Sequence, residues 1–146
     1  MDFARTRFDS NCGHRVPGQD TGNHDDWTLA LEHVAFGDLT GDGLDEAAVL
    51  LSCTTGGSAG PQPEVHVFTM RDDELGTIAK LPGGNKLLGP EDVAIENARL
   101  RIVRYFQTGN AMPLEEEIET LRWNGAAMVR ANLVRRHVAI DAGGAP

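Results

Sequence analysis

The sequence lacks long apolar stretches and clear helical periodicity. No apolar run approaches the roughly 20 residues that a transmembrane helix needs. Apolar residues come instead in short runs separated by Gly, Pro, Asn and Asp clusters, which is typical of strands joined by turns. No alternation of strands with helices is visible. We therefore predict an all-β protein, a single-domain antiparallel meander that forms a sandwich or a partly closed barrel with propeller-blade-like hairpins.

Basic residues are scarce. The chain of 146 residues has 13 Lys and Arg against 22 Asp and Glu, so the formal net charge is −9. Binding to nucleic acid and docking on anionic membranes both need a basic surface, and this balance argues against both. A cation or a basic protein partner remains compatible with the charge.

The expected strands cover most of the chain. A first, N-terminal strand and a Gly-rich flexible loop occupy residues 1–26, the meander occupies residues 27–136, and residues 137–146 form a frayed tail. Asn124-Gly125 predicts a two-residue hairpin turn in which both residues take positive φ. Helical spacing is also present in residues 113–122, but the neighbouring turn favours a strand there. The expected strands are residues 3–8, 28–36, 46–53, 64–71, 75–81, 92–96, 99–106, 116–123 and 127–134.

Residues 38–46, with the sequence DLTGDGLDE, contain the most informative pattern. Side-chain oxygens fall at alternate positions, and Gly43 can take the left-handed conformation that a sharp bend needs. A hard cation such as Ca²⁺ requires six or more oxygen ligands, which this arrangement can supply. The alternative is a tight turn without a metal, capped by its own acidic side chain. The predicted ligands are the side chains of Asp38, Thr40, Asp42 and Glu46 and the backbone carbonyl of Leu44.

Residues 36–49 resemble the FG-GAP and VCBS-type repeat, which carries a calcium loop between two strands. The resemblance implies the same five ligand positions, although Thr40 stands where Asn or Asp is usual and Glu46 where Asp is usual. Residues 28–126 also resemble a group of small uncharacterised bacterial exported proteins. They share this loop, an apolar strand ending in Cys and a late Arg-x-Trp-x-Gly hairpin, here residues 122–125. That likeness implies export and a shared fold but no activity.

The two cysteines, Cys12 and Cys53, fit no zinc motif. A disulfide between them would stabilise the fold by roughly 4 kcal/mol in the chain-entropy model. The alternative is two separate buried thiols. No signal peptide is visible at residues 1–5, which fits either a cytosolic protein or a mature secreted domain with a new start. We favour an extracytoplasmic, disulfide-bonded protein, periplasmic or secreted, because a calcium-type loop also belongs outside the cytosol.

Other chemistry in the sequence is weaker. Residues 56–60 match the Gly-x-Ser-x-Gly pattern of hydrolases around Ser58, but the next segment predicts a strand rather than the required helix. The glutamates in residues 115–119 are typical of a solvated strand face. Glu117 and Glu119 would share one side of that strand, yet nothing divides acid and base roles between them.

The sequence therefore predicts a non-catalytic exported binding or structural domain with a calcium-type loop. Its partner would be a protein or a cell-surface polymer, and the oligomeric state is open. One alternative is a small acidic inhibitor of a secreted enzyme such as a lysozyme, on charge alone. A second alternative is a hydrolase.

Overall fold

The computed structural model describes residues 2–10, 13–18, 28–54, 63–72, 74–82, 90–107 and 114–138. Ten strands and one short 3₁₀ helix lie in these ranges. They are η1 (Phe3–Arg5), β1 (Phe8–Ser10), β2 (Gly13–Arg15), β3 (Thr28–Gly37), β4 (Glu46–Thr54), β5 (Glu64–Arg71), β6 (Glu74–Pro82), β7 (Pro90–Glu96), β8 (Arg99–Gln107), β9 (Leu114–Trp123) and β10 (Met128–Val138). No helix in this part of the chain is long and apolar enough to cross a membrane.

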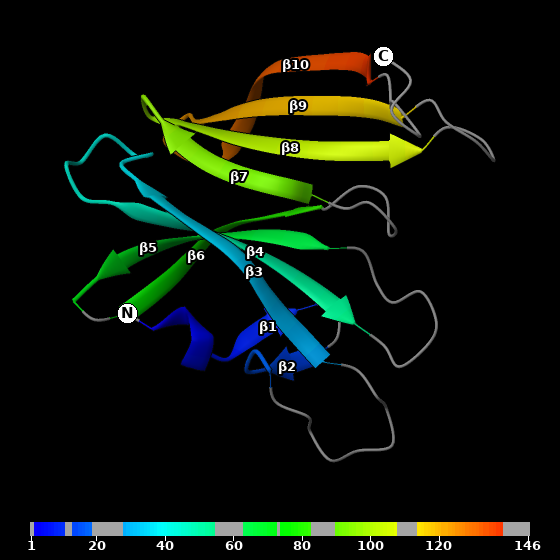
Figure 1. The fold of residues 1–146 in the computed structure, drawn as a ribbon. Helices are drawn as coiled ribbons and strands as arrows, with labels where there is room; N and C mark the ends of the chain where they lie inside the picture. The colour runs from blue at the N-terminus through cyan, green and yellow to red at the C-terminus, as the bar shows by residue number, and fades with distance from the viewer. Residues whose placement is uncertain are drawn as a thin grey trace.

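The strands form two four-stranded antiparallel meanders. Sheet I has the order β3-β4-β5-β6, and sheet II has the order β10-β9-β8-β7. Each strand pairs only with its neighbours along the chain, as expected for strands joined by short turns. The all-β antiparallel fold is therefore confirmed. Within the described ranges the sheets stay open at their edges, so the arrangement is a sandwich and not a closed barrel (Figure 1).

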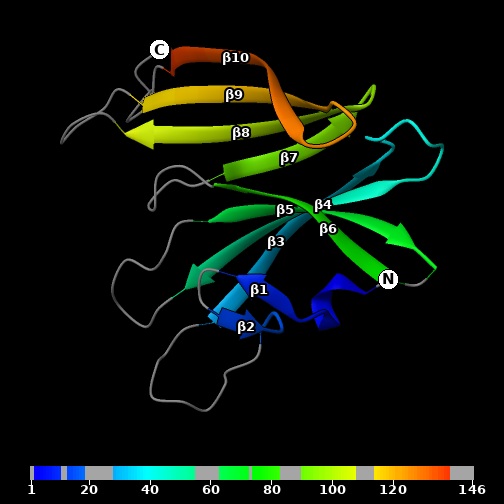
Figure 2. The same cartoon turned by 180° about the vertical axis from the view of Figure 1, so that it is seen from behind.

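The molecule has three layers. Sheet II lies on one side of sheet I, and the β1–β2 hairpin with η1 lies on the other (Figures 1 and 2). Alternation along β4 sends Ala48 and Leu50 toward sheet II, where they pack with Val93 and Ile102. Sheet I is therefore the middle layer.

The second face of sheet I packs against the amino-terminal segment. Val49 and Leu51 of β4 point to this side and pack in one cluster with Phe3, Phe8 and Phe68. Because both of its faces are covered, β4 is apolar and buried without interruption over residues 47–51.

The amino-terminal prediction of a strand over residues 3–8 was wrong. Phe3–Arg5 forms a 3₁₀ turn, and the strand begins only at Phe8. The Asp2 carboxylate accepts a hydrogen bond from the Ala4 amide at 3.1 Å, which caps the turn. The predicted loop after Ser10 instead returns as β2, which pairs with β1. Residues 11, 12 and 19–26 of that predicted loop lie outside the described ranges.

The two-residue hairpin turn with both φ positive that was predicted at Asn124-Gly125 is found at a different place in the chain. Only Gly125 has positive φ in the Asn124 turn, which spans four residues between β9 and β10. The Asn124 side chain accepts hydrogen bonds from the Ala126 and Ala127 amides at 2.8 and 2.9 Å, so it caps the turn. The two-residue turn with both φ positive occurs instead at Asn97 and Ala98. At the carboxyl end, β10 reaches Val138, beyond the predicted start of the tail.

Candidate functional site

The acidic loop of residues 38–46 connects β3 to β4, as predicted. Gly41 and Gly43 have φ of +83° and +85°, a region that other residues rarely adopt. The left-handed bend predicted at Gly43 is confirmed, and Gly41 adds a second one. These two bends let the chain double back over only eight residues between the paired ends Gly37 and Glu46.

Asp38 and Glu46 hold the loop through its own backbone. Asp38 accepts hydrogen bonds from the Gly41 and Gly43 amides at 2.7 and 2.8 Å. Glu46 is fully buried, and its Oε1 accepts from the Leu39 and Thr40 amides at 2.7 and 2.9 Å. The loop therefore owes its shape to carboxylates that accept several backbone N–H groups.

The structure brings three of the predicted ligands together. One carboxylate oxygen each of Asp38, Asp42 and Glu46 lies within 4.8 Å of the others. Thr40 Oγ1 is buried and has no hydrogen-bond partner, the only such side-chain atom in the described part of the chain. A buried hydroxyl without a partner is costly, and a cation among these oxygens would supply one. The oxygen set therefore fits a hard divalent ion.

An arginine from a different strand also reaches this cluster. Arg71 ends β5, and the pairing of Glu46 with Thr69 places it beside the loop. Its Nη2 donates to Glu46 Oε2 at 3.0 Å and also contacts the Asp42 carboxylate. The guanidinium thus supplies a positive charge where the carboxylates would repel one another.

The electrostatics of the loop favour its charged forms. The hydrogen bond from the Leu44 amide lowers the pKa of Asp42, and the nearby Thr40 hydroxyl and the Arg71 guanidinium lower it further. The hydrogen bond to Glu46 raises the pKa of Arg71. At neutral pH the loop therefore presents ionised Asp42 to Arg71 or to a cation, which is the state a metal ligand requires.

The remaining predicted site residues have separate outcomes. Leu44 lies in the loop with its side chain half exposed, and its amide donates to Asp42 at 2.9 Å. The role of its carbonyl as a ligand stays a prediction. Cys53 is buried in β4 and packs in the same cluster as Phe8 of β1. Cys12 and Ser58 lie outside the described residues, so the disulfide and the hydrolase motif stay predictions.

Sequence reasoning missed a network of charges on sheet II. Glu116, Glu117 and Glu119 of β9 are buried, so the predicted solvated face was wrong. Glu117 and Glu119 share one side, as expected, and both accept from Arg104 of β8, at 3.4 and 3.0 Å. Arginines on β10 complete the network. The signal available in the sequence was the run of glutamates in residues 115–119 together with the arginines in residues 99–104 and 130–136.

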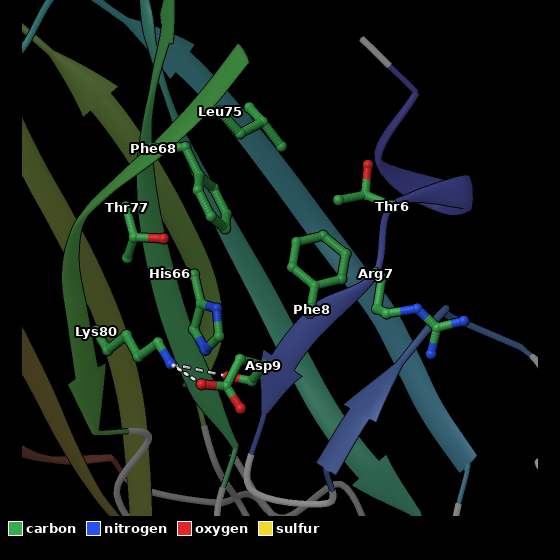
Figure 3. Close-up of a pocket in the computed structure, with 9 residues that line it drawn as sticks. All are labelled: Thr6, Arg7, Phe8, Asp9, His66, Phe68, Leu75, Thr77 and Lys80. Atoms are coloured by element: carbon green, nitrogen blue, oxygen red, sulfur yellow. Dashed lines mark hydrogen bonds and ion pairs between the residues drawn. The ribbon is translucent and has the colours of Figure 1, made fainter.

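A cleft lies between the amino-terminal segment and strands β5 and β6 of sheet I (Figure 3). It encloses about 480 Å³, and the rings of Phe8, His66 and Phe68 converge at its inner end. No motif in the sequence indicated it, because its walls come from separate strands. Its lining residues are Thr6, Arg7, Phe8, Asp9, His66, Phe68, Leu75, Thr77 and Lys80.

Comparisons with known proteins leave the family open. The chain matches no family model, no curated protein and no solved structure. The resemblance to the FG-GAP and VCBS-type repeat therefore stays a prediction, and function must be argued from the geometry of this chain.

Proposed function

We propose that this protein is a non-catalytic extracytoplasmic binding or structural domain in which the loop of residues 38–46 binds Ca²⁺. The observation that carries the proposal is the gathering of three carboxylates in a loop whose buried Thr40 hydroxyl has no hydrogen-bond partner. Asp38, Thr40, Asp42 and Glu46 would hold the ion through side-chain oxygens, and Leu44 through its carbonyl. The ion would neutralise the carboxylates and fix the turn between β3 and β4.

Arg71 gives this site a built-in competitor. The carboxylates of Asp42 and Glu46 that would hold the ion also accept from its guanidinium. Ca²⁺ binding would therefore displace Arg71 toward solvent, to which its side chain is already one-third exposed. This exchange predicts a calcium affinity lower than that of a loop without a tethered cation, because the ion must replace an existing charge pair.

Exposed apolar side chains support a binding role. Phe36, near the end of β3, is 52% exposed, and Leu44, within the loop, is 51% exposed. In a complex, these two side chains would add apolar area removed from water. A fixed loop would hold both side chains in place for a protein or surface-polymer partner.

Calcium titration tests the proposal. Saturating Ca²⁺ should raise the melting temperature of the wild type by about 5–10 °C, as expected for a ligand near a hundred times its dissociation constant. The double variant Asp38→Asn with Asp42→Asn should lose both this shift and the heat of binding. Mg²⁺ serves as the ion control in the same calorimetric and melting experiments.

A second arm tests the competition. Arg71→Gln should bind Ca²⁺ more tightly than the wild type, since no guanidinium then occupies the carboxylates. The exposed Arg122 of β9 offers a matched control, and Arg122→Gln should leave the affinity unchanged. A wild type that shows neither heat nor a melting shift with Ca²⁺ would refute the proposed site. Equal affinity in the wild type and Arg71→Gln would refute the competition alone.

A further inference from the structure

The cleft beside the amino-terminal segment has an aromatic inner end. The ring centroids of Phe8 and Phe68 lie 5.8 Å apart, and the His66 ring lies 6.1 and 6.0 Å from them. Phe68 and His66 come from β5, and Phe8 comes from β1 (Figure 3). Leu75 of β6 adds an aliphatic wall. A flat apolar molecule therefore meets complementary surface on entering this cleft.

A buried histidine lines the inner end of the cleft. The side chain of His66 is 1% exposed, and its Nε2 lies 2.6 Å from Glu64 Oε1. An ionised carboxylate can only accept, so Nε2 carries the proton. In the tautomer whose Nε2–H points to Glu64, Nδ1 is an acceptor, and the hydrogen bond of this ring within the described residues is the one made by Nε2. A ligand with an O–H or N–H donor would satisfy Nδ1.

The charged groups at the cleft compensate one another. Lys80 Nζ donates to the carboxylate and to the backbone carbonyl of Asp9, at 3.1 and 3.0 Å. The Arg7 guanidinium points away from the three rings (Figure 3). A charged ligand would have to compete with the Lys80–Asp9 pair, whereas an uncharged ligand leaves it intact.

We propose that this cleft binds an uncharged aromatic molecule that carries a hydroxyl donor, with its ring against Phe8, Phe68 and Leu75 and its O–H directed to His66 Nδ1. A phenol or a fused-ring phenol has this chemistry. The volume of about 480 Å³ lies within the usual range of small-molecule sites and admits two fused rings. The site is separate from the acidic loop and does not depend on a cation there.

A matched pair of probes tests this assignment. The fluorescence of 2-naphthol should change on binding to the wild type, and 2-methoxynaphthalene, which lacks the O–H donor, should bind about tenfold more weakly. 2-Naphthoate adds a negative charge and should bind more weakly than 2-naphthol. Equal affinity for the two uncharged probes, or tighter binding of 2-naphthoate, would overturn the proposed ligand class.

Two variants locate the binding. His66→Phe keeps a ring but removes the acceptor, so it should bind both uncharged probes equally. His66→Phe also removes the buried partner of Glu64 and could destabilise the fold. A second variant, at an exposed position, therefore tests the site without removing a buried contact. Thr77→Trp places a bulky ring at the rim of the cleft and should lower the affinity for both uncharged probes at least tenfold.

The controls separate this site from the loop. Asn132→Trp, at an exposed position of β10, should leave probe binding unchanged. The double variant Asp38→Asn with Asp42→Asn should also bind both probes like the wild type, whether or not Ca²⁺ binds the loop. Unchanged 2-naphthol binding in Thr77→Trp would show that the probe binds elsewhere and would overturn the proposal.

Discussion

The two sheets solve the problem of burial in different ways. Sheet I is covered on both faces, and its β4 is an apolar strand with no exposed position over residues 47–51. Sheet II is apolar only where it meets sheet I, through Val93, Ile102 and their neighbours. Toward β10, its inner strand buries glutamates that pair with arginines of both adjacent strands.

The contrast shows that a strand can be buried without being apolar, as the buried glutamates of β9 illustrate. Each buried carboxylate of β9 pairs with a guanidinium of an adjacent strand, so no charge is left uncompensated. Such pairs add little net stability relative to apolar packing, but removing one partner is costly. Sheet I should therefore be sensitive to lost volume, and sheet II to lost charge.

The largest loss is expected for Leu51→Ala in sheet I. Leu51 is fully buried in the cluster with Phe3 and Phe8, so truncation removes apolar contact and leaves a cavity. The free energy of unfolding should fall by about 3–4 kcal/mol. Urea denaturation measures it, with the half-buried Leu133 of β10 as the matched control. Leu133→Ala should cost less than half as much, and equal costs would contradict the contrast between the sheets.

A smaller loss is expected for Glu119→Gln in sheet II. Glu119 accepts from Arg104 at 3.0 Å and from Arg130 at 2.7 Å, and Arg104 is buried. Neutralising it should cost about 2–3 kcal/mol, because the buried Arg104 loses the shorter of its contacts to the β9 carboxylates. The comparison is Arg135→Gln, which removes an exposed partner of Glu117 and should cost less than about 1 kcal/mol. If chemical denaturation gives equal losses in the free energy of unfolding for Glu119→Gln and Arg135→Gln, the burial of Arg104 does not increase the cost of losing its partner.

The smallest effect is a pH dependence at Glu116. The hydrogen bond from the Tyr105 hydroxyl, 2.9 Å long, lowers the pKa of Glu116 below its usual 4.5, and Arg136 adds to this. Stability from a lowered pKa is present above that value and disappears as the pH falls through the pKa of the folded state. Tyr105→Phe should therefore cost about 1 kcal/mol at pH 7 and progressively less below pH 4.5. A pH-independent difference in denaturation would mean that Tyr105 acts only through packing.

Much of the fold could be predicted from local patterns. The strand over Glu64–Arg71 has the predicted bounds, and β3, β4 and β9 start or end within two residues of expectation. The acidic loop was found because its ligand spacing and its glycines are contiguous in sequence. The amino-terminal strand was mispredicted because the capping of Ala4 by Asp2 is a single short-range hydrogen bond that outweighs a weak alternation.

The candidate sites show where local patterns are insufficient. Arg71 is 25 residues from Glu46 along the chain, and only the pairing of β4 with β5 brings it to the loop. The cleft joins Phe8, His66 and Thr77 from three different strands. Neither feature has a sequence signature, since strand pairing decides which distant residues meet.

By itself, the sequence determined the all-β class, the positions of most strands and the bend of the acidic loop. These depend on side-chain alternation, on turn residues and on glycine, which act within a few residues of one another. Only the tertiary structure decided that β9 buries its glutamates, that Arg71 pairs with Asp42 and Glu46 of the loop and that a cleft opens beside Phe8. Burial and charge pairing depend on what the neighbouring strand and the opposite layer supply, and those neighbours are distant in sequence.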